Sequence, residues 1–526
     1  MKRNFKIGLV GCLLVLIVAS SCTKDFNDIN TNPISYSSKN FDPNFVFTTA
    51  ELTYSGSTDY AYETWRGNLI YASTMMQGLA SLSSYWAGDK YMLTPWYTSA
   101  YWERAYSEQV KPIVDIVEST RGKAEYNNIY NVARIWKALI FARLTDLYGD
   151  IPYSEAGMGY YSKQLKPKFD GQESIYKDIL KELDEASAAI DPSKDALKGD
   201  IVYNGDLEKW RRLGYSAMLR CAMRLVKVDE TTAKTYAQKA VGKTFVSNDD
   251  NARIKHDING GRATQNRNAQ VFLDGGQEHY YVRWSKTFID FLKANNDPRL
   301  KVAVTNYFTD PATSNVTNPN YITAAASQKG MPNGKDLSGV AGRDISSDPA
   351  YTKITDYSQP HPDMLKRDAP SFVMTYSEAE FLWAEASTRW SIGGSAADHY
   401  KNGVAKSIAT LGQWGANMAV TDADADAFAA AHPLQVATAL QQINEQIWLQ
   451  SCITFNFYEA WSNWRRTGYP VLTPVNYPNN ATNGVIPRRF PYPTAEEASN
   501  PDNYKAASAA VPGGDLLTGR VWWDKQ

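Results

Sequence analysis

The sequence predicts an all-α fold in which paired helices form the scaffold and long irregular loops separate the helical blocks. Three observations lead to this fold class. Apolar residues recur at steps of three and four in several segments, capping residues stand where those segments begin, and Gly- and Pro-rich stretches lie between them. The chain has 526 residues, 43% hydrophobic and 21% charged, so it can bury a large core.

The first helical block contains three amphipathic stripes. They consist of Ile129, Val132, Trp136, Leu139, Ile140, Leu144 and Leu147; of Ile175, Ile179, Leu183, Ala186 and Ile190; and of Trp210, Leu213, Ala217, Cys221 and Leu225. Asp206 precedes the third stripe, where its carboxylate can accept from unpaired backbone N–H groups. We therefore expect three helices here, the last capped by Asp206.

A second helical block begins near Thr375. Thr375 with Glu378, and Ser377 with Glu380, both fit a capping box. The apolar stripe after them consists of Ala379, Leu382, Ala386 and Trp390. This segment predicts a well-capped helix.

One long helix is predicted from Ile443 to about Trp464, ended by Gly468 and Pro470. Across both blocks the helices come in pairs, as in tetratricopeptide-type solenoids, where each pair buries its apolar face against the next. The repeat signature itself is degenerate, so the pairing is the better guide to this tetratricopeptide-like scaffold.

The first 21 residues have the order of a cleaved signal peptide. Lys2, Arg3 and Lys6 precede an apolar run of thirteen residues, and small residues then lead to Cys22. A cysteine at this position resembles the acylated residue of a bacterial lipoprotein. Cys12 is rejected, because only five residues separate it from Lys6 and an apolar core needs roughly 7 to 15. We expect lipid attachment at Cys22, with an ordinary secretory signal as the alternative.

Residues 22–45 are predicted to be a polar tether between the lipid and a single domain, residues 46–526. Helical patterning is concentrated in 46–247 and 371–470. The remaining segments, 248–370 and 471–526, are rich in Gly, Asn, Asp and Pro. Loops of that length in a compact domain are usually functional or disordered. No other segment is predicted to span the membrane, since none approaches eighteen uninterrupted apolar residues.

Composition and motifs argue against several functions. The net charge is −1, or −4 once the three cations of the signal are removed, and no basic stripe indicates nucleic-acid binding. The five histidines lack metal-ligand spacing, and no phosphate loop, dinucleotide fingerprint or nucleophile elbow occurs. We expect no metal, no cofactor and no catalytic residue. Cys221 and Cys452 lie on apolar helical faces and are predicted to be buried thiols.

Asp422, Asp424 and Asp426 imitate the start of a calcium-binding loop. Position six would be Ala427 rather than Gly, and position twelve is Pro433 rather than Glu. The aspartates are therefore predicted to cap a helix that starts at Ala427.

Five strings resemble motifs of the SusD/RagB family of nutrient-binding outer-membrane lipoproteins, in its SusD-like branch. They are LTDLYGDIPYSEA at 144–156, SKTF with NDPRL within 285–300, YSEAEFLWAEA at 376–386, EAW with WRRTGYP within 459–470, and IPRRFPYP at 486–493. Their order covers essentially the whole mature chain.

The resemblance implies a tetratricopeptide-like scaffold with loop-built ligand surfaces. It also implies a partner, a SusC-like TonB-dependent transporter in the outer membrane, and a lipoprotein that faces the cell exterior. The motif residues look structural: Gly149 can take positive φ after a helix, and Arg465 and Arg466 suit the end of one.

Two aromatic clusters outside clean helical stripes are the candidate ligand-binding surface. They consist of Tyr85, Trp86 and Trp96, and of Tyr280, Tyr281 and Trp284. Tyr and Trp combine a flat apolar body with a polar group, which suits sugar rings and extended peptides. In the resembled family the ligand surface comes from loops in these parts of the chain.

Three functions remain open at this point. The first is capture of an oligosaccharide and its delivery to the transporter, and the second is the same architecture binding peptides. The third is an anchored glycoside hydrolase, suggested by carboxylate pairs such as Asp146 and Asp150.

Overall fold

The computed structural model describes residues 42–59 and 61–525. A compact unit extends from Asn44 to Gln526, and residues 1–43 are a separate unit. The predicted signal peptide, Cys22 and the tether before residue 42 lie outside the described residues. Within the described ranges, no helix combines the length and apolarity needed to cross a membrane.

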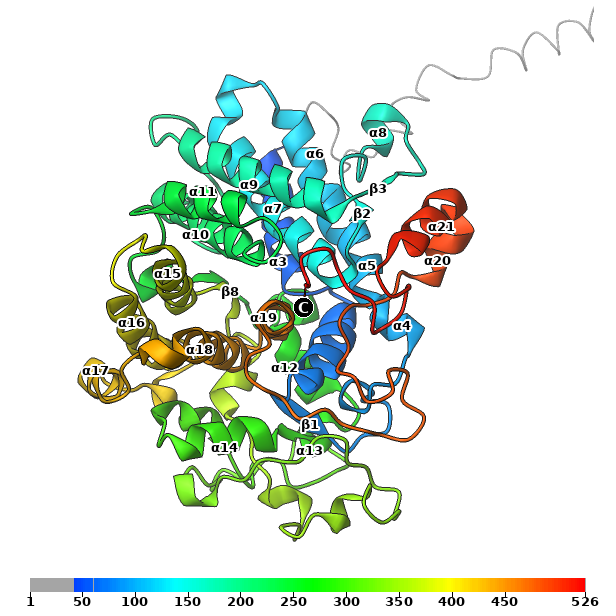
Figure 1. Ribbon diagram of the computed structural model, residues 1–526, viewed down its shortest axis with the longest axis vertical. Helices are drawn as coiled ribbons and strands as arrows, with labels where there is room; N and C mark the ends of the chain where they lie inside the picture. Colours follow the sequence, from blue (N-terminus) through cyan, green and yellow to red (C-terminus); the bar gives the residue numbers. More distant parts are fainter. Residues whose placement is uncertain (1–41, 60, 526) are drawn as a thin grey trace, which may run out of the picture. The chain divides into compact units, whose positions relative to one another are not determined.

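Helices make up most of the compact unit, which confirms the all-α prediction (Figure 1). The first block contains α3 (Pro43–Tyr54), the π-helix η1 (Thr64–Ser73), α4 (Pro95–Thr98), α5 (Ala100–Arg104), the π-helix η3 (Ala105–Val110), α6 (Lys111–Thr120), α7 (Asn127–Tyr148), α8 (Gly159–Ser162), α9 (Gln172–Ala189), α10 (Leu207–Arg224) and α11 (Glu230–Ala240). The loop-rich middle contains α12 (Arg267–Asp274), α13 (Glu278–Tyr281) and α14 (Lys286–Ala294). The second block contains α15 (Tyr376–Trp390), α16 (Ala396–Ala409), α17 (Asp422–Ala431), α18 (Ala439–Ile453) and α19 (Phe457–Thr467), and α20 (Thr494–Ser499) and α21 (Pro501–Ala510) follow.

The long helices pack in sequence, as expected for a scaffold of helix pairs. In the first block α6 packs on α7, α7 on α9, α9 on α10 and α10 on α11. In the second block α16 packs on α15, α17 on α16 and α19 on α18. Contacts of α15 with α10 and of α19 with α7 join the two blocks (Figure 1). The apolar stripes of neighbouring helices thereby form one continuous core.

The described strands form four two-stranded antiparallel ribbons between these helices. The pairs are β1 (Leu79–Ser81) with β5 (Val282–Trp284), β2 (Ile151–Pro152) with β3 (Phe169–Asp170), β4 (Ala252–Ile254) with β8 (Ser371–Met374), and β6 (Ala303–Val304) with β7 (Gln359–Pro360). In the first ribbon Leu79 lies opposite Trp284. Three of the four ribbons bring segments more than fifty residues apart into register, and β1–β5 positions the candidate site.

Several predicted local features are confirmed. Asp206 caps α10 by accepting two backbone N–H groups, and Thr375 caps α15. α7 ends at Gly149, whose φ of +86° favours glycine. Cys221 and Cys452 are both buried free thiols.

The prediction of one long helix from 443 to 464 is wrong, because the helix is interrupted between α18 and α19. Phe455 at the break has a φ of +57°, and Asn68 donates to its carbonyl oxygen at 2.9 Å. The Phe455 ring lies 5.8 Å from that of Trp284 and 5.9 Å from that of Trp414, centroid to centroid. Burial of this ring among aromatic neighbours offsets the interrupted helical hydrogen bonds.

The predicted helix start at Ala427 is also wrong, since α17 begins five residues earlier, at Asp422. Thr421 Oγ1 accepts from the backbone N–H of Asp424 at 3.1 Å. A hydroxyl thus caps the helix, and Asp422 and Asp424 lie in its first turn, where carboxylates favour the helix dipole.

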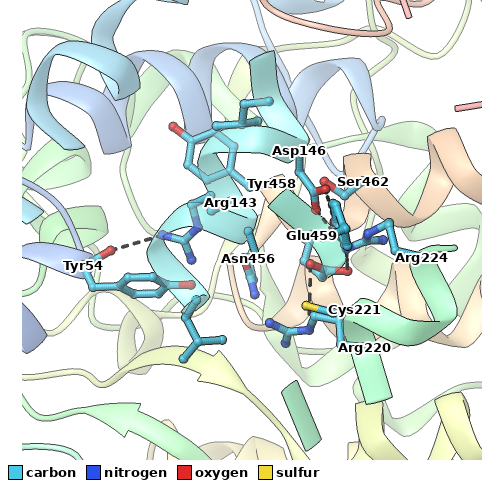
Figure 2. A pocket seen from close by; sticks show the side chains of 14 residues that line it. Tyr54, Arg143, Asp146, Arg220, Cys221, Arg224, Asn456, Tyr458, Glu459 and Ser462 are labelled. Carbon is cyan, nitrogen blue, oxygen red and sulfur yellow. Dashed lines mark hydrogen bonds and ion pairs between the residues drawn. The ribbon is translucent and has the colours of Figure 1, made fainter. Parts of the chain in front are cut away.

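A buried network of charges lies where the two helical blocks meet. Arg220 and Arg224 project from α10, and Arg220 Nε lies 2.6 Å from Glu378 Oε1 on α15. Arg224 Nη2 lies 2.6 Å from Glu459 Oε1 on α19 and 3.3 Å from Asp146 Oδ2 on α7. Figure 2 shows four of these side chains around one small cavity. The sequence predicts that Glu378 completes a capping box, but its carboxylate pairs with Arg220 instead.

The network continues into the last helix of the scaffold. The Arg466 guanidinium binds both oxygens of Glu385, at 2.6 and 2.7 Å. Arg465 Nη1 donates to the carbonyl oxygen of Asp146 at 2.6 Å. Arg489 Nη2 donates to the carbonyl oxygen of Tyr148 at 2.8 Å, which fixes the C-terminal segment to α7. Four of the five motif segments are thus bound to one another by charged side chains.

Glu385→Gln is expected to lower the free energy of unfolding by about 3–5 kcal/mol, because it leaves Arg466 buried without its counter-charge. Denaturant unfolding at pH 7 measures the change. Glu173→Gln, in an exposed pair with Lys177, is the control and should change stability by less than about 0.5 kcal/mol. Equal, small effects of the two variants would contradict a structural role for the network.

The same pair predicts a dependence on pH. Arg466 and Arg389 offset the effect of burial and lower the pKa of Glu385 to about 2, below its value of about 4.3 in an unfolded chain. A lowered pKa stabilises the fold above the unfolded value, and this contribution is lost as the pH falls from about 4.3 towards 2. The Glu385→Gln variant should therefore lose less of its free energy of unfolding than the unaltered protein as the pH falls from about 4.3 towards 2.

Candidate functional site

Two aromatic clusters that are distant in the sequence lie together in the structure. Tyr85 and Trp86 follow β1, and Tyr280 and Tyr281 precede β5. The two strands pair, and the backbone N–H of Leu82 donates to the carbonyl of Tyr281 at 3.2 Å. The predicted clusters are therefore parts of one region.

The carboxylate of Glu278, fully buried at the start of α13, joins these segments. Its Oε1 accepts from Trp65 Nε1 at 3.1 Å, from Trp86 Nε1 at 3.4 Å and from the Tyr85 hydroxyl. Its Oε2 accepts from the backbone N–H of Gln277 at 3.1 Å. Burial and the Glu278 charge raise the pKa of Tyr85 above its usual range, so this phenol remains a donor. Three aromatic side chains are thus held by one residue that the sequence analysis did not identify.

Two of the predicted ligand contacts are in the core. Trp86 and Trp284 are each 0% exposed, so the prediction that they are surface platforms is wrong. The Trp284 ring stacks on Phe288 with a centroid distance of 4.4 Å and an interplanar angle of 19°. Its Nε1 donates to the carbonyl of Val302 at 3.1 Å. Trp86 and Trp284 are buried against partners that are distant in the sequence, Glu278 and Phe455, which loop composition alone does not reveal.

The other four predicted residues keep part of their surface. Trp96 on α4 is 51% exposed, and Tyr85, Tyr280 and Tyr281 are half-buried. The rings of Tyr280 and Tyr281 meet edge to face at 5.0 Å. These four residues remain the predicted ligand contacts.

The structure adds three residues from η1 and the turn before it. The Arg66 guanidinium carbon lies 3.8 Å from the ring centroid of Tyr62, 4.8 Å from that of Trp96 and 5.0 Å from that of Trp65. Tyr62, Trp65 and Arg66 are all half-buried. We call Tyr62, Trp65, Arg66, Tyr85 and Trp96 the aromatic face.

An apolar-stripe pattern does not reveal Trp65 and Arg66, because they lie in the π-helix η1, whose period differs from that of an α-helix. The signal that could have found them is the close spacing of Tyr62, Trp65 and Arg66, which places two aromatic side chains and a cation within five residues. π-Helical turns also occur frequently at functional sites.

Two cavities among the described residues are too small for a sugar or peptide. The cavity in Figure 2, between Asp146, Arg220 and Glu459, has a volume of about 30 Å³. Its neighbour, which shares Tyr54 and Arg143, has about 50 Å³. Ligand pockets usually measure about 300–1,000 Å³, so these spaces suit only water molecules.

Two larger hollows lie elsewhere. A groove of about 680 Å³ is lined by residues of 293–301, 323–326 and 419–424. None of the described residues that line it is aromatic. A cleft of about 280 Å³ lies beside Gly149 and Trp522. Among residues 42–59 and 61–525, no group of three or more His, Cys, Asp and Glu side chains could hold a metal ion.

Comparisons with known proteins fit this architecture. Residues 42–493 match the model of a SusD-like family described as starch-binding and associating with the outer membrane. A solved structure described as a chitin-binding protein is 34% identical, with a TM-score of 0.79, and the match covers 92% of this chain and 100% of that one. A SusD-like protein of Bacteroidetes AC2a is 27% identical, with a TM-score of 0.78 and coverage of 92% and 100%.

A chitin-binding SusD homolog from Flavobacterium johnsoniae shares the fold at 23% identity, with a TM-score of 0.73 and coverage of 92% and 99%. No significant match was found among curated proteins. The family model and the 34% identical structure show that the chain belongs to the SusD-like family, which confirms the predicted resemblance.

Glu278→Ala is expected to destabilise the protein by about 1–3 kcal/mol, because it leaves the buried indole N–H of Trp86 without an acceptor. Denaturant unfolding followed by tryptophan fluorescence measures both stability and the change around Trp65 and Trp86. Glu278→Gln keeps an acceptor oxygen and should lose less. If Glu278→Ala is as stable as the unaltered protein, this carboxylate does not organise the site.

Proposed function

We propose that the protein is an outer-membrane lipoprotein that captures a nutrient oligosaccharide on the aromatic face and passes it to a TonB-dependent transporter. The observation that carries the proposal is a set of partly exposed aromatic rings, two of which, Trp65 and Tyr85, donate to the buried carboxylate of Glu278. Such rings can stack on the apolar faces of sugar rings without rearrangement, which reduces the entropy lost on binding.

The family and the neighbours support a carbohydrate ligand. The family model is described as starch-binding, and the 34% identical structure is described as a chitin-binding protein. Binding of a neutral glycan also suits a site without a large enclosed pocket, since a long chain can contact several rings of an open surface. A peptide is the alternative ligand, because half-exposed Tyr and Trp side chains serve both classes.

Hydrolysis is a weaker proposal. Asp146, one of the two carboxylates that suggested a glycosidase, faces a cavity of about 30 Å³ and pairs with Arg224. Asp150 accepts from the backbone N–H of Gln172 at 2.8 Å. Both side chains have structural partners, and a glycosidase needs two carboxylates on either side of a bound sugar.

The transporter partner and the lipid anchor are also part of the proposal. The family description associates its members with the outer membrane. The predicted signal peptide and Cys22 supply an attachment through acyl chains, of which a single one holds a protein only weakly and two or three hold it durably.

Trp96→Ala should weaken oligosaccharide binding by roughly 5- to 150-fold, which corresponds to about 1–3 kcal/mol for one lost stacking platform. The melting temperature should stay near that of the unaltered protein, because the indole is half exposed. Calorimetry with hexamers of N-acetylglucosamine, of α-1,4- and β-1,4-linked glucose, and with peptides, measures binding. Tyr160→Ala, on the 88% exposed Tyr160 of α8, is the control.

Equal effects of Trp96→Ala and Tyr160→Ala would place the ligand elsewhere. Binding of peptides without any glycan would support the alternative ligand class. Release of shorter sugars from any hexamer would revive the hydrolase.

Cys22→Ala should move the full-length protein from the membrane fraction to the soluble fraction and abolish its labelling with a radioactive fatty acid. Cys12→Ala is the matched control and should change neither. Labelling that depends on Cys12 would overturn the predicted attachment.

A further inference from the structure

The Arg66 side chain lies among the rings of the aromatic face. Four rings surround its guanidinium, those of Tyr62, Trp65, Trp96 and Tyr97, with centroids 3.8 to 5.6 Å from the guanidinium carbon. Its one hydrogen bond to the described residues runs from Nη1 to the carbonyl of Tyr62, at 3.2 Å. The buried Arg267 provides a contrast, because its Nε, Nη1 and Nη2 all donate to backbone carbonyl oxygens.

The nearby Arg104 provides the contrast. It also lies over the Tyr62 ring, at 4.9 Å, but it pairs with Asp59 at 2.7 Å and with Glu108 at 2.9 Å. No carboxylate of the described residues lies within ion-pair distance of Arg66, and burial lowers its pKa from its usual range. Arg66 therefore has unused donor capacity.

The donors of Arg66 differ in their access to a ligand. Nε is enclosed by its neighbours and has no acceptor, while Nη2 makes no hydrogen bond and is not enclosed. The guanidinium carbon lies 4.8 Å from the centroid of the Trp96 ring, and Trp96 is 51% exposed. This combination offers a charged donor and an apolar surface to the same part of a ligand.

The surrounding charges select the kind of acceptor. Asp59, Glu103 and Arg104 all interact electrostatically with Tyr62. The carboxylate of Glu278 accepts a hydrogen bond from Trp65 Nε1. A carboxylate on the ligand would be attracted by Arg66 but repelled by Asp59, Glu103 and Glu278. A neutral carbonyl oxygen accepts the same hydrogen bond without that repulsion. The carbonyl of an acetamido group meets this requirement, and its methyl group can contact the ring of Trp96.

We propose that Arg66 and its surrounding rings form a subsite for the acetamido group of an N-acetylated amino sugar. The inference rests on the proposed function and deepens it, because it names the class of sugar that Arg66 would recognise. A chain of unsubstituted glucose offers only hydroxyl groups at this position, so Arg66 should distinguish the two glycans.

Calorimetry with two hexamers that share the β-1,4 linkage tests the subsite. They are the hexamer of N-acetylglucosamine and that of glucose, with a galacturonate hexamer as an acidic ligand. The unaltered protein should bind the first more tightly than the other two. Arg66→Met, which keeps an unbranched side chain of similar length, should weaken the first by about tenfold or more and the glucose hexamer by less than about twofold.

Arg104→Met is the matched control and should leave the preference unchanged. Equal losses for both hexamers, or no change in either, would overturn the subsite and leave the proposed function intact. Tightest binding of the galacturonate hexamer would also overturn it. Binding of the α-1,4-linked glucose hexamer but of none of these three would overturn the subsite alone. If the unaltered protein binds no glycan at all, the proposed function fails and this inference fails with it.

Discussion

The ion pairs between α7, α10, α15 and α19 are the constraint on which the rest of the structure depends. Asp146, Arg224 and Glu459 are nearly inaccessible to solvent, and each would be costly to bury alone. The cost is offset only when all partners are in place, so the network favours one arrangement of the two helical blocks. In Figure 2 these charges face a water-sized cavity, as expected of a structural centre.

The aromatic face depends on this frame through a short series of contacts. α19 packs on η1, and the hydroxyl of Tyr458 on α19 donates to the carbonyl of Glu63 at 3.0 Å. η1 carries Trp65, which Glu278 holds from the other side. Because Tyr458, Glu63 and Glu278 are themselves buried, these contacts position Trp65 before any ligand arrives.

Local features of the sequence predicted a large part of the fold. Asp206, Thr375 and Gly149 act within one turn of a helix, so their roles follow from neighbouring residues. The break at Phe455 was not predictable in this way, because its ring packs against Trp284 and Trp414, which are distant in the sequence. The apolar period continues through the break and conceals it.

The site was less predictable for the same reason. Trp86 and Trp96 look alike in the sequence, yet the first reaches a buried carboxylate and the second remains in solvent. Glu278 gains its role from three donors, of which Trp65 lies 213 positions away. These donors meet at Glu278 only in the folded chain, so local sequence patterns do not reveal the site.

A crystal structure of the protein with the N-acetylglucosamine hexamer is the most direct test of the central claim, that the aromatic face binds the ligand. The account predicts a sugar ring against the indole of Trp96, with an acetamido oxygen within hydrogen-bond distance of Arg66 Nη2. It also predicts that the backbone of η1 stays in place. A hexamer in the groove lined by residues of 293–301 and 419–424, with the aromatic face unoccupied, would contradict it.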